Sequence, residues 1–460
     1  MDQADVNCFA WQEFIALNWL ADTTTCAADS SAPASAFGEP GAGPVVWQTY
    51  KAPGEVFLAD AAPPPAWCEP QTKGATSTRP YRLSAINKFV GGPQLDLDAF
   101  TEVSPKGSWL TAQSGDLTLY DVRMNEDEFA YVAGNKLYDA DKQQAVAQSN
   151  AGLQLPDDSD GKNGIGSIEL KAAWIELDDK SDWPNYLTTT ATVTYPGGKP
   201  TQATMGLVGL HIIHKTFNAQ QFVWATFEHV DNAPTAGNLP SPGSGPQYTY
   251  YDADCNPQTD PYKCVPNPPT QDPGPPPSPP FDAPVQAVRE LAIPSTTTNN
   301  VAGLNAWVWN LIKQSNASSV FLNYQLVDVL WPNSNTPVAP GQRTPLPTGA
   351  PQPSQAVANT TLETYVQSET CLVCHINAPI ASTSGKQEVV TVTEPVLTST
   401  ATTPSEGPYG ADYSFLLSKA QSPPSGGPSA VLIAGGALLV AAAGGGAAVA
   451  RRRRRGAGSP

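Results

Sequence analysis

The chain has 460 residues, a formal net charge of −17, 47 prolines, 37 glycines and 40% hydrophobic residues. This length allows two or three domains or one large domain with insertions, and the proline content favours long loops between folded parts. The acidic balance excludes nucleic acid as a partner, because phosphate binding requires a basic surface, but it would attract a basic redox protein.

The N-terminal half predicts two helices and several strands. Residues 8–20 carry apolar residues at helical spacing and predict an amphipathic helix that packs on the body. Asn125 precedes a run of acids, which is a helix-start pattern, so a helix is expected over 125–138. Runs rich in β-branched and aromatic residues predict strands at 45–50, 164–177 and 187–195.

Residues 205–232 predict a β-hairpin at the centre of the fold. The runs MGLVGLHIIHKT and FVWATFEHV flank residues 217–221. Both runs are largely apolar on both faces, as in a pair of strands that is buried on two sides. Glu228 lies in the second run, and we interpret it as a hydrogen-bond acceptor on the strand face.

The hairpin contains three of the four histidines. Pairing position 216 with position 222 would place His211 and His229 on one face, about 7–8 Å apart. His214 would then lie on the other face, nearer the turn, where it is solvated or hydrogen-bonded.

The C-terminal half predicts fewer regular elements. Residues 301–313 have the pattern of a helix or a strand, and residues 319–329 predict a strand. Residues 356–369 have helical spacing and lead the chain to Cys371.

Five of the seven cysteines are candidates for disulfides, which imply an oxidising compartment. Cys255 and Cys264 flank a proline-rich loop that a disulfide would hold together. Among the remaining three, we favour a bond between Cys8 and Cys26, and Cys26–Cys68 is the competing pairing.

Cys371-Leu372-Val373-Cys374-His375 has the C-x-x-C-H pattern of covalent haem attachment. The two thiols form thioethers with the porphyrin, and the imidazole becomes the proximal iron ligand. At this composition, chance gives only about 0.001 occurrences of the pattern. A zinc site would need two more ligands at similar spacing, and the sequence has no second C-x-x-C and no H-x₃-H. We therefore expect one covalent haem c held by Cys371, Cys374 and His375.

The second axial ligand of the iron must come from upstream if it is a histidine or a methionine, because neither residue type follows His375. His211, in the middle of an apolar strand, is the first candidate, and His229 is the second. Met124 directly precedes an acid-rich helix start and is expected at the surface.

The C-terminal tail predicts a membrane anchor. Residues 430–450 are uncharged and long enough for a transmembrane helix of about 20 residues, and five arginines at 451–455 would stay cytoplasmic. A disordered Ala/Gly-rich tail is the alternative. The glycine pair at 426–427 followed by this segment resembles the C-terminal sorting signals of bacterial surface proteins. Residues 1–7 are acidic and have no apolar core, so a signal peptide is expected to be missing from this chain.

The expected fold class is α+β: a β-rich body with a central antiparallel hairpin, peripheral helices, long Pro-rich loops and a C-terminal transmembrane helix. The predicted parts are a body with an N-terminal helix, a Pro-rich insertion, a continuation of the body that carries the haem segment, a Ser/Thr/Pro/Gly-rich linker and a membrane or sorting segment. Their boundaries are 1–255, 256–285, 286–380, 381–428 and 429–455.

Several segments, FAWQEFIALNW, SIELKAAW, FVWATFEHVDNAP, NTTLETYVQ and CLVCH among them, together resemble a family of uncharacterised bacterial proteins identified as c-type cytochromes. The resemblance runs from roughly residue 8 to residue 420. It implies haem binding and electron transfer and names no substrate.

These observations predict a membrane-anchored monohaem cytochrome c of the cell envelope, with its body in the periplasm or at the cell surface and a basic redox partner. One alternative is a peroxidase-like haem oxidoreductase with an open distal site, where His211 or His229 acts as acid or base. The other is a surface binding or structural protein with an accessory haem.

Overall fold

The computed structural model describes residues 2–68, 81–83, 110–159, 164–193, 201–243, 247–260, 263–267, 284–332, 356–368, 370–376, 378–383 and 409–424. These residues belong to one compact unit, Met1–Pro424. A second unit, Ser425–Pro460, lies outside the described residues.

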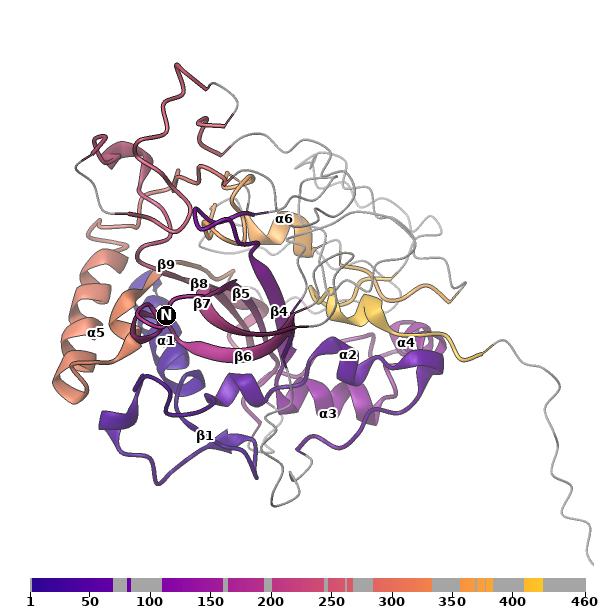
Figure 1. The fold of residues 1–460 in the computed structure, drawn as a ribbon. Coiled ribbons are helices and arrows are strands. Elements are labelled where there is room, and N and C mark those ends of the chain that lie inside the picture. Colours follow the sequence, from indigo (N-terminus) through magenta and orange to yellow (C-terminus); the bar gives the residue numbers. More distant parts are fainter. Residues whose placement is uncertain are drawn as a thin grey trace, which may run out of the picture. The chain divides into compact units, whose positions relative to one another are not determined.

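A seven-stranded mixed sheet forms the centre of the first unit (Figure 1). Its strands are β3 (Tyr81–Leu83), β4 (Leu119–Met124), β5 (Ile168–Glu176), β6 (Thr188–Val193), β7 (Thr201–Thr216), β8 (Ala219–His229) and β9 (Tyr324–Leu330). One edge of β7 pairs with β5, which pairs with β4; the other edge pairs first with β6 and then with β8, which pairs with β9. All these pairs are antiparallel. The remaining strand, β3, pairs in parallel with β6.

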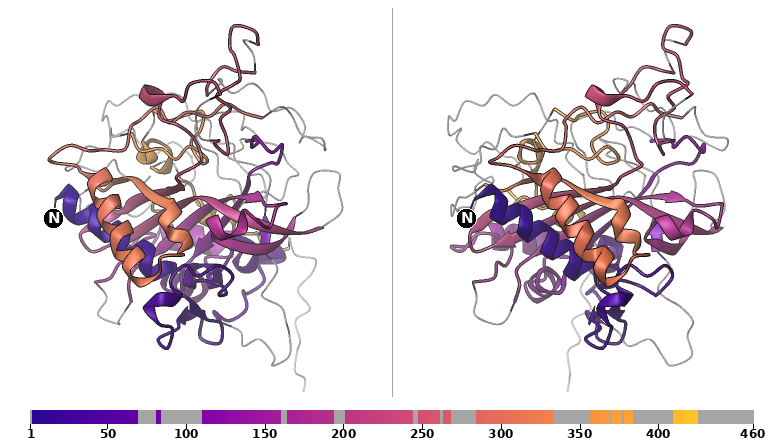
Figure 2. Two further views of the ribbon diagram at one scale, coloured as in Figure 1. Left: turned by 60° about the vertical axis from the view of Figure 1, so that its left-hand side comes forward. Right: turned by 90° about the vertical axis from the view of Figure 1, so that its left-hand side faces the viewer.

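Six α-helices and a two-stranded ribbon surround the sheet in the described residues. The helices are α1 (Gln3–Leu17), α2 (Pro53–Val56), α3 (Glu126–Gly134), α4 (Ala140–Ala147), α5 (Val301–Ser315) and α6 (Cys371–His375). The ribbon pairs β1 (Ala21–Asp22) with β2 (Ala27–Ala28). Figure 2 shows α1 and α5 side by side on one face of the sheet, where both contact β9. We call this the helical face.

Aromatic packing and one buried amide hold the helical face together. The ring of Phe227 on β8 lies 4.4 Å from Phe14 and 5.0 Å from Trp11 of α1, measured between centroids. Trp11 Nε1 donates to Asn305 Oδ1 on α5, and Asn305 Nδ2 donates to the carbonyl of Leu326 on β9. A single asparagine therefore links both helices to the sheet edge.

Most predicted elements are present, with shifted ends. The N-terminal helix α1 begins at Gln3 and ends at Leu17, and Asn125 caps α3 by accepting a hydrogen bond from the Glu128 backbone. The ambiguous segment 301–313 is helical.

Two predicted elements are wrong. Residues 46–49 form a 3₁₀ turn rather than a strand, because the Gln48 side chain accepts a hydrogen bond from the Val45 backbone and closes the turn. The helix expected at 356–369 is absent from the described part of that segment, which forms turns. Its Asn and Thr side chains bond to nearby backbone groups and so compete with helical hydrogen bonds.

The predicted register of the hairpin is also wrong. The turn is shorter than expected, consisting of Phe217 and Asn218, and Thr216 pairs with Ala219. The register shifts again between His214 and Thr216, so that His211 lies opposite Thr226 and Gly209 lies opposite Glu228. A slip of one residue reverses the face of each side chain, so His211 shares its face with Glu228 and not with His229.

The second face of the sheet is polar at its centre. It carries Lys171 of β5, His211 of β7, and Thr226 and Glu228 of β8, and we call it the loop face because irregular segments cover it. Lys171 lies directly opposite His211, which lies directly opposite Thr226, so the three form one row across three strands.

The disulfides are Cys255–Cys264, as predicted, and Cys26–Cys68. The favoured Cys8–Cys26 bond is wrong, because Cys8 is an exposed free cysteine on α1. Apolar packing and polar contacts, rather than a covalent bond, hold α1 in place.

The expected fold class needs one further correction. The longest α-helices of the described segments, α1 and α5, have 15 residues each, and none of the described helices has the length and hydrophobicity to cross a membrane. Residues 430–455, where we expected the transmembrane helix and its arginine stop, lie outside the described residues. The described fold is a β-rich body with peripheral helices.

A buried ion pair fixes α1 against β7. His214 Nδ1 bonds to the Glu13 carboxylate, and Nε2 donates to the carbonyl of Ile165 at 2.5 Å. Burial alone would lower the pKa of His214, but the Glu13 carboxylate outweighs it and raises the pKa above the ordinary 6.5. Both ring nitrogens act as donors, so the bound form is the imidazolium.

We predict that this pair stabilises the fold most in weakly acidic solution. Because the folded pKa of His214 exceeds the unfolded value, its contribution is complete below about pH 6.5 and is lost as the pH rises through the folded pKa. A double-mutant cycle of His214→Gln and Glu13→Gln, measured by urea unfolding, should give a coupling energy of about 1.5–3 kcal/mol at about pH 6 that declines at higher pH.

His229→Gln is the control for this cycle. Burial lowers the pKa of His229, so its neutral form is the native one and its contribution is lost toward low pH instead. A Glu13–His214 coupling energy that stays constant across the alkaline range would contradict the assignment.

Candidate functional site

The C-x-x-C-H segment forms α6, one short helical turn against the body. Cys371 is half-buried, Leu372 is only 1% exposed and His375 is 8% exposed. Positions four apart on a helix share a side, so Cys371 and His375 lie on the same side of α6. The side chain of Cys374 lies outside the described residues. Leu372 packs into an apolar cluster with Val122 of β4, so the motif is part of the main body.

The imidazole of His375 is held in one orientation by three contacts. Nδ1 donates to the carbonyl oxygen of Tyr413 at 2.7 Å. The ring meets Trp224 of β8 edge-on at 4.4 Å between centroids and Phe415 at 5.1 Å. A ring nitrogen that faces a carbonyl oxygen must carry the proton, so the lone pair of the neutral imidazole is on Nε2. This is the tautomer in which histidine binds a metal through Nε2.

Two buried carboxyl groups lie close to this histidine. Glu169 extends from β5 and Glu128 from α3, and both belong to the buried residues. Burial raises the pKa of each, and in Glu128 the neighbouring Glu169 carboxylate raises it further. His375 and a hydrogen bond from Ser414 act in the opposite direction on Glu169. The two carboxyl groups interact, so we expect them to titrate as one coupled pair.

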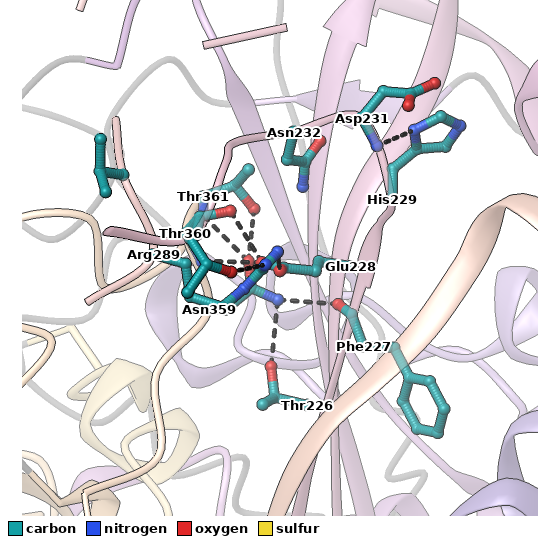
Figure 3. Close-up of polar contacts among 12 residues, drawn as sticks. Thr226, Phe227, Glu228, His229, Asp231, Asn232, Arg289, Asn359, Thr360 and Thr361 are labelled. Atoms are coloured by element: carbon teal, nitrogen blue, oxygen red, sulfur yellow. Dashed lines mark hydrogen bonds and ion pairs between the residues drawn. The ribbon is translucent and has the colours of Figure 1, made fainter. Parts of the chain in front are cut away.

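A second group of polar contacts lies on the loop face (Figure 3). Glu228 of β8 is fully buried and pairs with Arg289, and it accepts hydrogen bonds from the backbone N and Oγ1 of Thr360 at 3.0 and 2.7 Å. The interpretation of Glu228 as a hydrogen-bond acceptor is therefore confirmed. Through it, segment 356–368 is bound to the centre of the sheet.

Asn359 adds a second attachment of the same segment. Its Nδ2 donates to Thr226 Oγ1 at 3.0 Å and to the carbonyl of Phe227 at 2.7 Å (Figure 3). Its Oδ1 accepts from the backbone N and the Oγ1 of Thr361. All these groups are buried, so each would be costly to leave unpaired.

We call the bonds of Glu228 and Asn359 that hold segment 356–368 on the sheet the clamp. His211, the first distal candidate, lies next to it. Its Nε2 bonds to Glu363 Oε1 at 3.0 Å, and Glu363 Oε2 accepts from the backbone N of Asn359 at 2.8 Å. His211 shares the loop face with Trp224, which contacts His375. The structure therefore places His211 on the same side of the sheet as α6.

His229, the second distal candidate, lies on the helical face. Its Nε2 donates to the carbonyl of Asn185 at 3.0 Å, its Nδ1 accepts from the backbone N of Asp231 at 3.3 Å, and its ring stacks on Tyr186. Both ring nitrogens thus have partners in the body. The structure does not bring His229 to α6.

The surface position expected for Met124 is wrong. Met124 is the last residue of β4, is 0% exposed and belongs to the same apolar cluster as Leu372 of α6. The backbone N of Asn125 donates to the carbonyl of Ile168 and keeps the strand end in the sheet, so the acidic helix begins only after Met124 is buried. Met205 is also buried, but in the cluster of the helical face.

Sequence reasoning missed the residues that hold His375. Trp224 and Tyr413 have no motif that points to α6. Within the described ranges, no group of three His, Cys, Asp or Glu side chains is arranged to hold a metal ion by itself. Comparisons with family models, characterised proteins and solved structures find no match to this chain.

We predict that Gly209→Ala loosens the clamp. A methyl group at Gly209 would meet Thr361 Oγ1 at 2.2 Å and Asn359 Oδ1 at 2.9 Å, which displaces the hydrogen-bonded segment. We expect a loss of about 1–3 kcal/mol in the free energy of unfolding, together with faster proteolysis within 356–368.

Gly237→Ala is the matched control, because its methyl group would meet nothing within 4 Å. It should change stability by no more than about 0.5 kcal/mol. Equal stabilities of the two variants would show that 356–368 is not held where we describe it.

Proposed function

We propose that this protein is an extracytoplasmic monohaem c-type cytochrome that transfers electrons. The observation that carries the proposal is the C-x-x-C-H motif on α6, with the His375 imidazole buried between Trp224 and Phe415 in its Nε2-binding tautomer. Few other functions require this residue pattern together with a histidine held by a carbonyl at Nδ1.

The residues present fit haem c in their chemistry. Cys371 and Cys374 would form the two thioethers, and His375 Nε2 would bind the iron; when bound, haem supplies a one-electron Fe(III)/Fe(II) couple. The chain's own contribution is positional. The Tyr413 carbonyl holds the proton on Nδ1, and the rings of Trp224 and Phe415 pack edge-on against the imidazole.

Cysteine usage and charge support the rest of the proposal. The two disulfides suit an oxidising, extracytoplasmic compartment, where covalent haem attachment also takes place. A net charge of −17 would attract a basic redox protein by long-range electrostatics.

A haem oxidoreductase is the second candidate, and one observation favours it. His211 bonds to Glu363 on the face that carries the α6 contact, and Lys171 lies directly across the strand pair from it. An imidazole oriented by a carboxylate is a common acid–base arrangement. This function requires that the sixth position of the iron be open to a substrate.

We predict covalent haem on the protein after expression with a c-type cytochrome maturation system. Acid–acetone extraction should leave the haem on the wild-type chain, as measured by the absorption of the denatured protein in alkaline pyridine. Cys371→Ala with Cys374→Ala should lose the haem, whereas Cys8→Ala, which changes a free and exposed cysteine, should keep it. Release of all haem from the wild-type chain would reject the proposal.

A second prediction concerns the distal ligand. We propose His211, and now also Met124, because both lie on the side of the sheet where α6 packs. Replacing the true ligand, by His211→Ala or Met124→Leu, should convert ferric haem from low-spin to high-spin in absorption and electron paramagnetic resonance spectra. His229→Ala on the helical face should leave the spectrum unchanged. If the wild-type ferric iron is already high-spin with bound water, the oxidoreductase is favoured over the carrier.

A further inference from the structure

Residues 409–415 form a strap that passes over His375. The strap is joined to the segment just after α6: the backbone N of Ile380 donates to Tyr409 O at 3.0 Å, and that of Ala411 donates to Ala378 O at 2.9 Å. The chain then turns sharply, and the carbonyl of Tyr413 meets Nδ1 of His375. The strap thus supplies the hydrogen bond at Nδ1 that orients the imidazole of His375.

The turn in the strap is strained. Asp412 and Tyr413 have φ angles of 52° and 70°, in the left-handed region that residues other than glycine rarely adopt. Each such residue costs on the order of 1–3 kcal/mol and persists only where its surroundings enforce it. Two in succession, neither of them a glycine, require a specific contact that holds the strap in this shape.

That contact is a buried ion pair. Asp412 Oδ2 accepts a hydrogen bond from Lys215 Nζ at 2.5 Å and another from the backbone N of Leu155 at 2.7 Å. Asp412 and Lys215 are each only 2% exposed. Lys215 lies at the end of β7, so the ion pair connects the strap to the rigid sheet.

Breaking a buried pair leaves an uncompensated charge and is strongly destabilising, which makes the contact selective for one position of the strap. Next to it, the ring of Phe222 lies 5.9 Å from Lys215 Nζ and 6.4 Å from the ring of Tyr413, between centroids in the second case. A movement of Asp412 would therefore also displace Tyr413, the next residue, whose carbonyl bonds to His375.

We propose that the Lys215–Asp412 ion pair is a positioning device that sets the hydrogen bond between His375 Nδ1 and Tyr413 and thereby tunes the reduction potential of the haem. This inference rests on the proposed function. A hydrogen bond from Nδ1 to a carbonyl makes Nε2 a stronger electron donor, and a stronger donor favours ferric over ferrous iron. Releasing the strap should therefore raise the potential.

The alternative is that the pair acts on the iron only through its charges. The two explanations predict shifts of opposite sign in the reduction potential of one variant. Asp412→Asn removes a negative charge, so both readings expect a higher potential. Lys215→Met removes a positive charge, so the charge reading expects a lower potential, whereas release of the strap expects a higher one. The direction of the shift in Lys215→Met decides between them.

The test is redox titration of the full-length haem protein and its variants, followed by absorption. We expect both Asp412→Asn and Lys215→Met to change the ratio of ferric to ferrous protein at fixed potential by about tenfold toward ferrous, which is about 59 mV for one electron. The Nδ1 proton resonance of His375 in NMR spectra should move to lower frequency in both, as expected for a weaker hydrogen bond. Asn tolerates a left-handed φ, so Asp412→Asn should fold; if Lys215→Met does not, Lys215→Gln gives the same sign test.

Asp121→Asn is the matched control. Asp121 is 3% exposed and pairs with Arg123 at 2.8 Å on β4, and by strand alternation its side chain lies on the helical face, away from α6. Like Asp412→Asn, the Asp121→Asn variant removes one negative charge from a buried ion pair, but it should leave the reduction potential unchanged. Potential shifts of opposite sign in Asp412→Asn and Lys215→Met, or no shift in either, would overturn this proposal while leaving the haem in place. A wild-type chain without haem would instead overturn the proposed function, and this proposal with it.

Discussion

The polar centre of the loop face is the constraint on which the rest of this structure depends. A sheet face that carries Lys171, His211 and Glu228 cannot be covered by the apolar side of a helix, because each buried polar group needs a partner. Irregular segments meet this need, since their backbone donors and acceptors are not used in a ladder. Segment 356–368 brings the backbone N of Thr360 to Glu228, and segment 409–424 brings Asp412 to Lys215. Irregular segments therefore cover the polar centre of this face, and α6 packs on its apolar part, where His375 contacts Trp224.

The sequence was a good guide to the helical face and a poor one to the loop face. Hydrophobic spacing predicts α1, β5 and β9 because the buried residues of these elements follow the regular spacing of apolar residues along a helix or a strand. It fails at 356–369, where Asn and Thr sit at helical spacing but use their side chains to bond backbone groups. Nothing local distinguishes these uses, since the partners of Asn359 are on β8, more than a hundred residues upstream.

The candidate site divides in the same way. The motif of Cys371, Cys374 and His375 can be recognised from the sequence because haem attachment, which we propose, requires that spacing. The surroundings of His375 cannot, because Trp224 and Tyr413 acquire their roles from strand register and from a strained turn. The error in register shows how sensitive this is: a net slip of one residue between β7 and β8 decides whether Glu228 or His229 shares a face with His211. The buried Met124 shows that a residue next to an acidic helix start can still belong to the core.

The burial of α6 limits the order in which such a protein can be assembled. Attachment of haem to C-x-x-C-H requires that an enzyme reach both thiols, yet Leu372 between them is 1% exposed and the strap crosses His375. If the proposed haem is attached here, the segment would be modified while the strap is open. The strap follows the motif in the chain and would emerge from the ribosome after it, so in a protein of the proposed function it would be suited to close over a haem that is already bound.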